Sequence, residues 1–155
     1  MKIRDVMSHE VSIASPDDSL QHCAAKMADL DVGALPVGEN DRLVGMITDR
    51  DLAVRGVACA CDPEETLVRD IMSAEVRHCY DDESVEHIAQ NMADQQIRRL
   101  PVVNHDKRLV GIVSLADMAL HLKSKAPSYA LRGISQPGGN HSQASDGSAM
   151  PMAND

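Results

Sequence analysis

The chain has 155 residues, of which 43% are hydrophobic, enough to build one packed domain or two small ones. Its formal net charge of -9 argues against nucleic acid as a main partner, because an acidic body repels a phosphate backbone. The apolar runs are short and interrupted by charges, and the first residues do not resemble a signal peptide. We therefore expect a cytoplasmic protein that does not enter a membrane.

The first predicted elements are a short segment from Ile3 to Met7 and a brief strand at 11–14. Ser19 then stands where a helix N-cap belongs. Apolar residues follow at helical spacing, which predicts a helix with one buried face: Leu20, Cys23, Ala24 and Met27.

Two short strands, 35–38 and 43–48, come next, and the turn-forming residues "ENDR" between them predict a hairpin. A second helix is expected to open at Thr48 and to end at Arg55-Gly56, with the glycine as its C-cap. The stretch "VACACDPEET" reads as a linker.

The same order of elements then returns, shifted by 65 residues from Met7 to Met72. "VRDIMSAEV" repeats "IRDVMSHEV", and "DESVEHIAQNMAD" repeats "DDSLQHCAAKMAD". The second copy predicts a strand at 76–79, a helix capped by Ser84, strands at 99–103 and 109–114, and a helix from Ser114. Chance does not keep register over such a length, so the chain contains an internal duplication.

Each unit is therefore predicted to be β-α-β-β-α, which makes the protein α/β with a three-stranded sheet in each half. Helices on one side leave the other sheet face uncovered, and the second copy is its natural cover. We expect one pseudo-twofold module whose sheets pack together, with repeats at 1–60 and 61–123. The tail at 124–155 is rich in Gly, Ser, Pro, Gln and Asn, which predicts disorder.

A motif recurs where each hairpin meets its second helix: "GMITDRD" from Gly45 and "GIVSLAD" from Gly111. Helix N-termini carry free N–H groups that can bind phosphate, and an Asp one turn inside can accept hydrogen bonds from ribose hydroxyls. The alternative is a capping box, in which the Asp folds back onto its own helix cap. The repeated glycine indicates close approach by another backbone or a ligand.

This duplicated pattern resembles the CBS domain, and a tandem pair of such domains forms a Bateman module. The resemblance runs from Ile3 to Lys123. In its layout the chain is similar to small stand-alone bacterial CBS-pair proteins, including hypoxic response proteins. It implies that Asp51 and Asp117 hold the ribose of an adenine nucleotide and that Thr48 and Ser114 lie near its phosphates.

The resemblance also implies which residues border the adenine: Ile13, Ala14, Ala34 and Leu35 in one copy, and His78, Cys79, Arg99 and Leu100 in the other. The expected ligand-binding set also includes the prolines that follow, Pro36 and Pro101. Within "TDRD", Asp49 and Arg50 join the expected ligand-binding set. The strongest candidate cations for phosphate are Arg98 and Arg99, with Arg50 as another. The alternative for these arginines is a solvated surface role. The second copy replaces the Asp-Arg of "TDRD" by Leu-Ala, which predicts a weaker or empty cleft there.

We thus predict a regulatory module that senses AMP, ADP, ATP or a relative such as S-adenosylmethionine. We expect it to need no cofactor or metal, to form a homodimer and to act on a protein partner. The sequence shows no arrangement typical of an enzyme active site. An alternative is a metal- or redox-responsive stress protein that uses Cys59, Cys61 and histidines.

Overall fold

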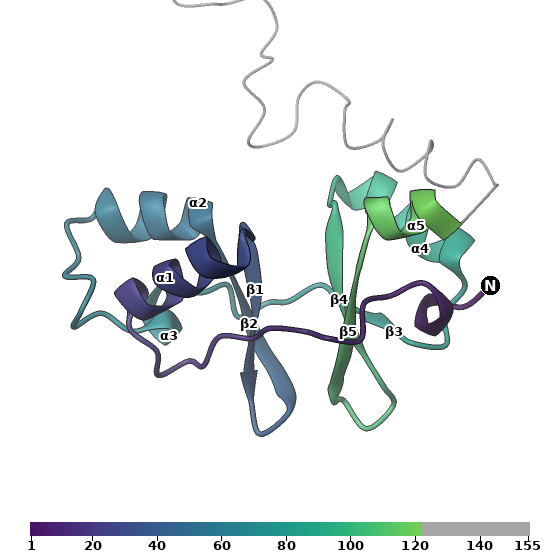
Figure 1. Cartoon of the computed structure of the whole chain (residues 1–155), viewed down its shortest axis with the longest axis horizontal. Helices are drawn as coiled ribbons and strands as arrows, with labels where there is room; N and C mark the ends of the chain where they lie inside the picture. Colours follow the sequence, from purple (N-terminus) through teal and green to yellow (C-terminus); the bar gives the residue numbers. More distant parts are fainter. Residues whose placement is uncertain (122–155) are drawn as a thin grey trace, which may run out of the picture.

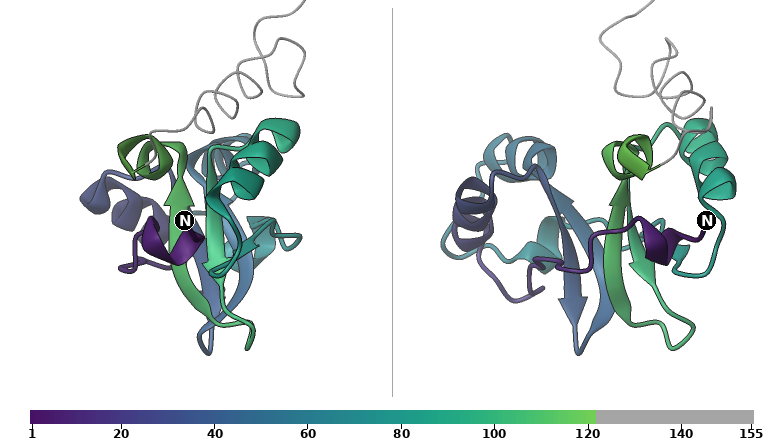
Figure 2. Two further views of the ribbon diagram at one scale, coloured as in Figure 1. Left: turned by 90° about the vertical axis from the view of Figure 1, so that its right-hand side faces the viewer. Right: turned by 45° about the vertical axis from the view of Figure 1, so that its right-hand side comes forward.

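The computed structural model describes residues 1–121, and the predicted tail at 124–155 lies outside them. Two α/β halves lie side by side, with a strand hairpin from each meeting at the centre and the helices on the outside (Figure 1). The turns of the two hairpins point to the same end of the molecule, opposite the helices (Figure 2). This arrangement agrees with the predicted α/β fold of two related halves.

The first half contains a helix, a hairpin and a second helical stretch. α1 spans Leu20–Leu30, and the Ser19 side chain accepts a hydrogen bond from the His22 N–H at 3.1 Å, as the predicted cap requires. β1 (Ala34–Glu39) pairs antiparallel with β2 (Arg42–Thr48). The helical stretch begins as α2 (Asp49–Asp51) and continues as η2, a π-helix over Leu52–Val57.

The second half follows the same plan. Its main elements are β3 (Cys79–Tyr80), α4 (Val85–Gln95), β4 (Arg99–Val103), β5 (Leu109–Ser114) and α5 (Leu115–His121). Two short helices precede the main elements of the two copies in the chain: η1 (Ile3–Asp5) and α3 (Val68–Ile71). The sheet order is β3-β4-β5, with β3 parallel to β4 and β5 antiparallel to it. Ser84 caps α4 through the His87 N–H at 3.1 Å, as predicted.

The predicted first strands are largely wrong. Residues 11–13 form no strand, and Ala14 makes only a single parallel bridge to Val37, so the first sheet has two strands rather than three. The segment fails to pair because it carries the chain across from one half to the other (Figure 1). In the second half the strand is shifted to Cys79–Tyr80 from the predicted 76–79.

The predicted end of the first copy's second helix is also wrong. The helical stretch runs past Gly56, which is buried against Leu20 rather than serving as a C-cap. The Ala58 N–H donates to the Ala53 carbonyl at 2.9 Å, a bond that spans five residues as in a π-helix, and the bond from Cys61 N–H to Gly56 O at 3.1 Å has the same span just beyond its end. A second, smaller difference is Ala24, which is exposed on α1 instead of belonging to its buried face.

The short segments that open the two copies are exchanged between the halves. We name residues 2–8 the first arm and residues 67–73 the second arm. The core of the second half contains Ile3, Val6 and Met7, whereas the core of the first half contains Val68 and Ile71. Two equivalent bridges, Ser8 to Ile112 and Ser73 to Met46, fasten the arms at 2.9–3.0 Å.

This exchange makes the halves a single folded unit, because neither core is complete without the other half's arm. It also explains the repeated glycines, since each arm crosses directly over Gly45 or Gly111. The close approach that those glycines predicted is therefore made by backbone and methionine of the opposite arm.

Candidate nucleotide-binding clefts

The repeated motif begins each second helix with a capping box. The Thr48 N–H donates to Asp51 Oδ2 at 2.9 Å, and the Asp51 N–H donates to Thr48 Oγ1 at 3.1 Å. In the second copy, the Ser114 N–H donates to Asp117 Oδ2 at 2.7 Å and the Asp117 N–H donates to Ser114 Oγ at 3.2 Å. The capping alternative therefore holds for both carboxylates in this structure.

The helix cap uses only one of the two oxygens of the Asp51 carboxylate. Asp51 Oδ2 serves the cap, whereas Oδ1 lies 3.9 Å from Nε of Arg55. The Asp51 side chain is 17% exposed and lines a cavity. One carboxylate thus caps its helix and still faces a cleft, so the two interpretations of the motif are compatible.

The larger cavity, which we name the central cleft, lies between the two halves and has a volume of about 770 Å³. Both halves contribute through equivalent positions, including the cap residues Thr48 and Ser114. Its lining is Gly33, Ala34, Met46, Thr48, Asp49, Arg50, Ile97, Arg98, Arg99, Ser114, Leu115 and Ala116. Among the acidic side chains of the described residues, only Asp49 lines this cleft, against three arginines.

The arginines of the central cleft are placed by the backbone. Arg99 pairs with Ser114 across the β4–β5 hairpin, and the Arg98 carbonyl accepts a hydrogen bond from the Leu115 N–H at 3.2 Å. Within residues 1–121, the side chains of Arg98 and Arg99 make no hydrogen bond or ion pair with another residue. By contrast, Arg69 and Arg108 each pair with a carboxylate.

A second cavity, the side cleft, has a volume of about 400 Å³ and adjoins the central cleft. The two clefts share Met46, Thr48 and Arg50. The remaining residues of the side cleft are Asp51, Val54, Arg55 and Ser73. A ligand that contacts Asp51 in the side cleft can therefore extend past Thr48 toward Arg98 and Arg99.

The other sequence-predicted site residues lie elsewhere. Six are buried in the cores or strands: Ala14, Leu35, Pro36, Cys79, Leu100 and Pro101. Asp117 is half-buried at its own helix cap, and His78 is exposed with Nδ1 3.1 Å from the Val76 carbonyl. Burial, with a smaller contribution from Glu83, raises the pKa of the Cys79 thiol to about 12, so Cys79 is a neutral core residue.

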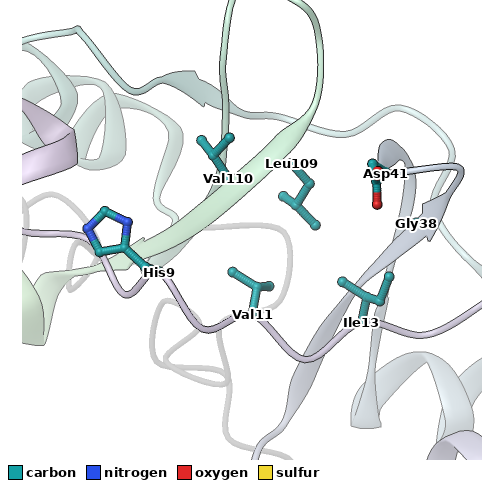
Figure 3. Close-up of a pocket in the computed structure, with 7 residues that line it drawn as sticks. All are labelled: His9, Val11, Ile13, Gly38, Asp41, Leu109 and Val110. Carbon is teal, nitrogen blue, oxygen red and sulfur yellow. The ribbon is translucent and has the colours of Figure 1, made fainter.

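Ile13 lies at a third, smaller cavity of about 170 Å³ that shares no residue with the other two (Figure 3). This cavity lies between the crossing segment and the two hairpins, and is lined by His9, Val11, Ile13, Gly38, Asp41, Leu109 and Val110. The structure thus separates Ile13 from Asp51 and the arginines.

Sequence reasoning missed four residues of the side cleft. Met46 lies inside the repeated motif, and Val54 and Arg55 follow it. Because all three are close to Asp51 in the sequence, they could have been predicted to line its cleft. Ser73 could not have been found in this way, because it reaches the cleft only through the exchanged second arm.

Cys59 and Cys61 lie at the end of the π-helix. Their Sγ atoms lie 4.0 Å from the Val54 carbonyl and 3.7 Å from the Arg55 carbonyl, respectively. In the described part of the chain, no group of three or more His, Cys, Asp or Glu side chains could hold a metal ion. None of the helices there is long and apolar enough to cross a membrane.

Comparisons with known proteins show the family and the fold. The profile of the CBS domain family matches residues 3–56 and 68–124. Hypoxic response protein 1 of Mycobacterium tuberculosis is 35% identical over 135 residues, covering 86% of this chain and 94% of the relative. The CBS domain-containing protein YhcV of Bacillus subtilis is 40% identical over 134 residues, with coverage of 86% and 94%.

Solved structures show the same fold. A crystal structure of Hypoxic Response Protein I with two coordinated zinc ions has a TM-score of 0.71 and 36% identity, covering 79% of this chain and 99% of that chain. The CBS domain pair of protein MJ0100, solved with 5-methylthioadenosine and S-adenosyl-L-methionine, has a TM-score of 0.67 and 28% identity, covering 77% and 98%.

Proposed function

The chain belongs to the CBS domain family, and on that premise we propose that it is a regulatory module that binds an adenine nucleotide across the side and central clefts. The observation that carries this proposal is the placement of Asp51 beside a cleft that continues to Arg98 and Arg99. Within residues 1–121 the side chains of Arg98 and Arg99 have no hydrogen-bond or ion-pair partner, and two such arginines in the cleft of an acidic protein favour an anionic ligand there.

In this proposal the nucleoside occupies the side cleft. Its ribose hydroxyls donate to Asp51 Oδ1, the carboxylate oxygen that does not cap the helix. Met46 and Val54 supply an apolar wall for the adenine ring. The adenosine-derived ligands of the MJ0100 pair support this choice of nucleoside.

The phosphates then extend past Thr48 into the central cleft, where Arg98 and Arg99 bind them. Arginine suits this role because its guanidinium donates two parallel hydrogen bonds to phosphate oxygens. The cluster favours AMP, ADP or ATP over S-adenosylmethionine, which carries a positive sulfonium.

The module acts on a partner rather than on a substrate of its own. Because each core contains the other half's arm, a ligand that bridges the halves can change how they pack. We also propose that two copies form a homodimer, which light scattering coupled to size-exclusion chromatography tests.

The experiment has two steps. Protein purified under native conditions is heat-extracted and its supernatant analysed by mass spectrometry, and we expect an adenine nucleotide. The stripped protein is then titrated with AMP, ADP, ATP and S-adenosylmethionine in a calorimeter. Saturable binding of at least one phosphorylated nucleotide supports the proposal, and no heat with any of the four would overturn it.

The metal- or redox-responsive alternative has less support. It is favoured by the two zinc ions in the Hypoxic Response Protein I structure. However, Cys59 and Cys61 point to carbonyls of the π-helix, and the described residues near them do not complete a metal site. Metal analysis of untagged protein, compared with a Cys59→Ser, Cys61→Ser double variant, decides between the two functions.

A further inference from the structure

Arg55 links the side cleft to the second arm. Its Nε lies 3.9 Å from Asp51 Oδ1, and its Nη1 donates to the Ile71 carbonyl at 3.2 Å. Asp51 belongs to the first half, whereas Ile71 lies in the arm that the second copy contributes to the first core. One guanidinium therefore contacts both a proposed ligand-binding carboxylate and an exchanged segment.

The π-helix accounts for this position. Arg55 lies within Leu52–Val57, where the backbone bonds span five residues instead of four. The wider turn changes the direction of every side chain after Leu52 relative to a regular α-helix. Arg50 and Arg55, five positions apart, consequently line the same cleft. π-helical turns are frequent at functional sites.

The second half shows no such link. The equivalent helix, α5, is a regular α-helix, and His121 stands at the position of Arg55. Its Nδ1 lies 2.8 Å from the carbonyl of Asp117, on its own helix, and not beside the Asp117 carboxylate. The contact between carboxylate, guanidinium and arm is thus specific to the first half within residues 1–121.

We infer that Arg55 is a positioning residue that couples occupancy of the side cleft to the packing of the second arm. This inference rests on the proposed function, because it assumes that a ribose binds Asp51. The proposed ribose hydroxyls contact Asp51 Oδ1, the oxygen that forms an ion pair with Arg55 at 3.9 Å, so a bound ribose weakens this ion pair. When the ribose binds, the guanidinium loses its carboxylate and releases the Ile71 carbonyl as it turns toward the ligand or the solvent.

Release of Ile71 weakens the second arm at the point where it meets β2. The arm is held there by the paired bonds between Ser73 and Met46, both 2.9 Å, and both residues line the side cleft. A ligand in the first half thereby loosens a segment that joins the two halves. This is a two-state element that ligand binding biases directly.

The test is hydrogen exchange of the full chain, measured by mass spectrometry with and without AMP. In the wild-type protein, saturating AMP should speed amide exchange in residues 67–73. In Arg55→Ala the same residues should exchange faster before AMP is added and show no further change. Removal of the competing cation should also tighten AMP binding about two- to fivefold, the range of an exposed ion pair.

Two variants serve as controls. Arg55→Lys keeps the cation and should restore part of the AMP response, which a purely structural role would not predict. Arg77→Ala removes another exposed arginine that also donates to a carbonyl, that of Gln95, and should behave as wild type. Circular dichroism confirms that each variant is folded.

The outcomes separate the inference from the proposed function. If AMP binds and Arg55→Ala keeps the full AMP response in 67–73, the inference is overturned and the proposed function stands. If the wild-type protein binds AMP and exchange in 67–73 does not change, the inference is likewise overturned and the proposed function stands. If the wild-type protein binds none of AMP, ADP, ATP and S-adenosylmethionine, both are overturned.

Discussion

Gly45 lies directly beneath Met72, so that a β-carbon on the glycine would come 2.5 Å from the methionine sulfur and 3.1 Å from the Ser73 carbonyl. Gly111 has the same relationship to Met7 in the other half, with distances of 2.5 Å and 2.9 Å. The glycine of the repeated motif is therefore required by the exchange of arms rather than by a ligand. The arms that cross over these glycines join the two halves, because each arm completes the core of the other half.

Gly45→Ala should destabilise the protein by about 1–3 kcal/mol, the usual effect of overpacking a tight site. Gly111→Ala should lose a similar amount, because its surroundings are equivalent. Urea denaturation measures both. Adding Met72→Ala to Gly45→Ala should give a total loss smaller than the sum of the two single losses, since the clash is removed. Additive losses would show that the methionine does not cause the effect.

Arg98→Ala and Arg99→Ala should each weaken ATP binding about tenfold or more, as expected for a lost charge-assisted hydrogen bond. Adenosine, which lacks phosphate, should bind both variants and the wild-type protein equally well. Calorimetric titration measures these affinities, with Arg77→Ala as the matched control. If the variants lost as much affinity for adenosine as for ATP, the phosphates would not bind in the central cleft.

Sequence reasoning identified the duplication and the helices well, because both depend on local patterns. Ser19 and Ser84 cap their helices as predicted. The exchange of arms could not be predicted, since Ile3 and Val68 fit a core of either half and only packing decides which. The π-helix was missed because Gly56 resembles an ordinary helix end.

The candidate site was predictable in part, because some of its residues belong to local sequence patterns. The motif supplied Thr48 and Asp51, and the doubled arginine before "LPV" supplied Arg98 and Arg99; these residues meet at adjoining clefts. The residues that border the adenine are harder to predict from the sequence. Leu35 and Leu100 alternate into the cores, and the direction of a strand's side chains depends on how the two halves pack.

His105 and Asp82 form a pH-dependent contact, with His105 Nε2 2.8 Å from Asp82 Oδ2. This hydrogen bond, strengthened by the charge of Asp82, raises the pKa of His105, and the same bond lowers the pKa of Asp82. The contribution of His105 to stability is complete below its unfolded pKa and is lost as pH rises through its raised pKa. The contribution of Asp82 is lost as pH falls through its lowered pKa.

A proton NMR titration should therefore show His105 titrating above the ordinary histidine pKa of about 6.5. Asp82→Asn should bring the pKa of His105 back toward that value. An unchanged pKa in the variant would contradict the assignment of the contact.

The cysteines should separate into two reactivity classes. Burial raises the pKa of the Cys23 thiol to about 11 and that of Cys79 to about 12, and thiolate is the reactive form. Cys59 is exposed and Cys61 is half-buried. Iodoacetamide should therefore modify Cys59 and Cys61 first in the native protein, as peptide mass mapping can show. Modification of Cys79 at the rate of Cys59 would contradict the described core.

The central claim is that Asp51 holds the ribose of a nucleotide while it also caps its helix. Asp51→Ala and Asp117→Ala break equivalent capping boxes, so each should lose about 1 kcal/mol of stability. This similarity makes Asp117→Ala a matched control for Asp51→Ala.

The most direct measurement is calorimetric titration of AMP into the wild-type protein and these two variants. We predict saturable binding to the wild type and to Asp117→Ala, with a loss of about tenfold or more in Asp51→Ala. Equal affinities for AMP in all three proteins would contradict the account.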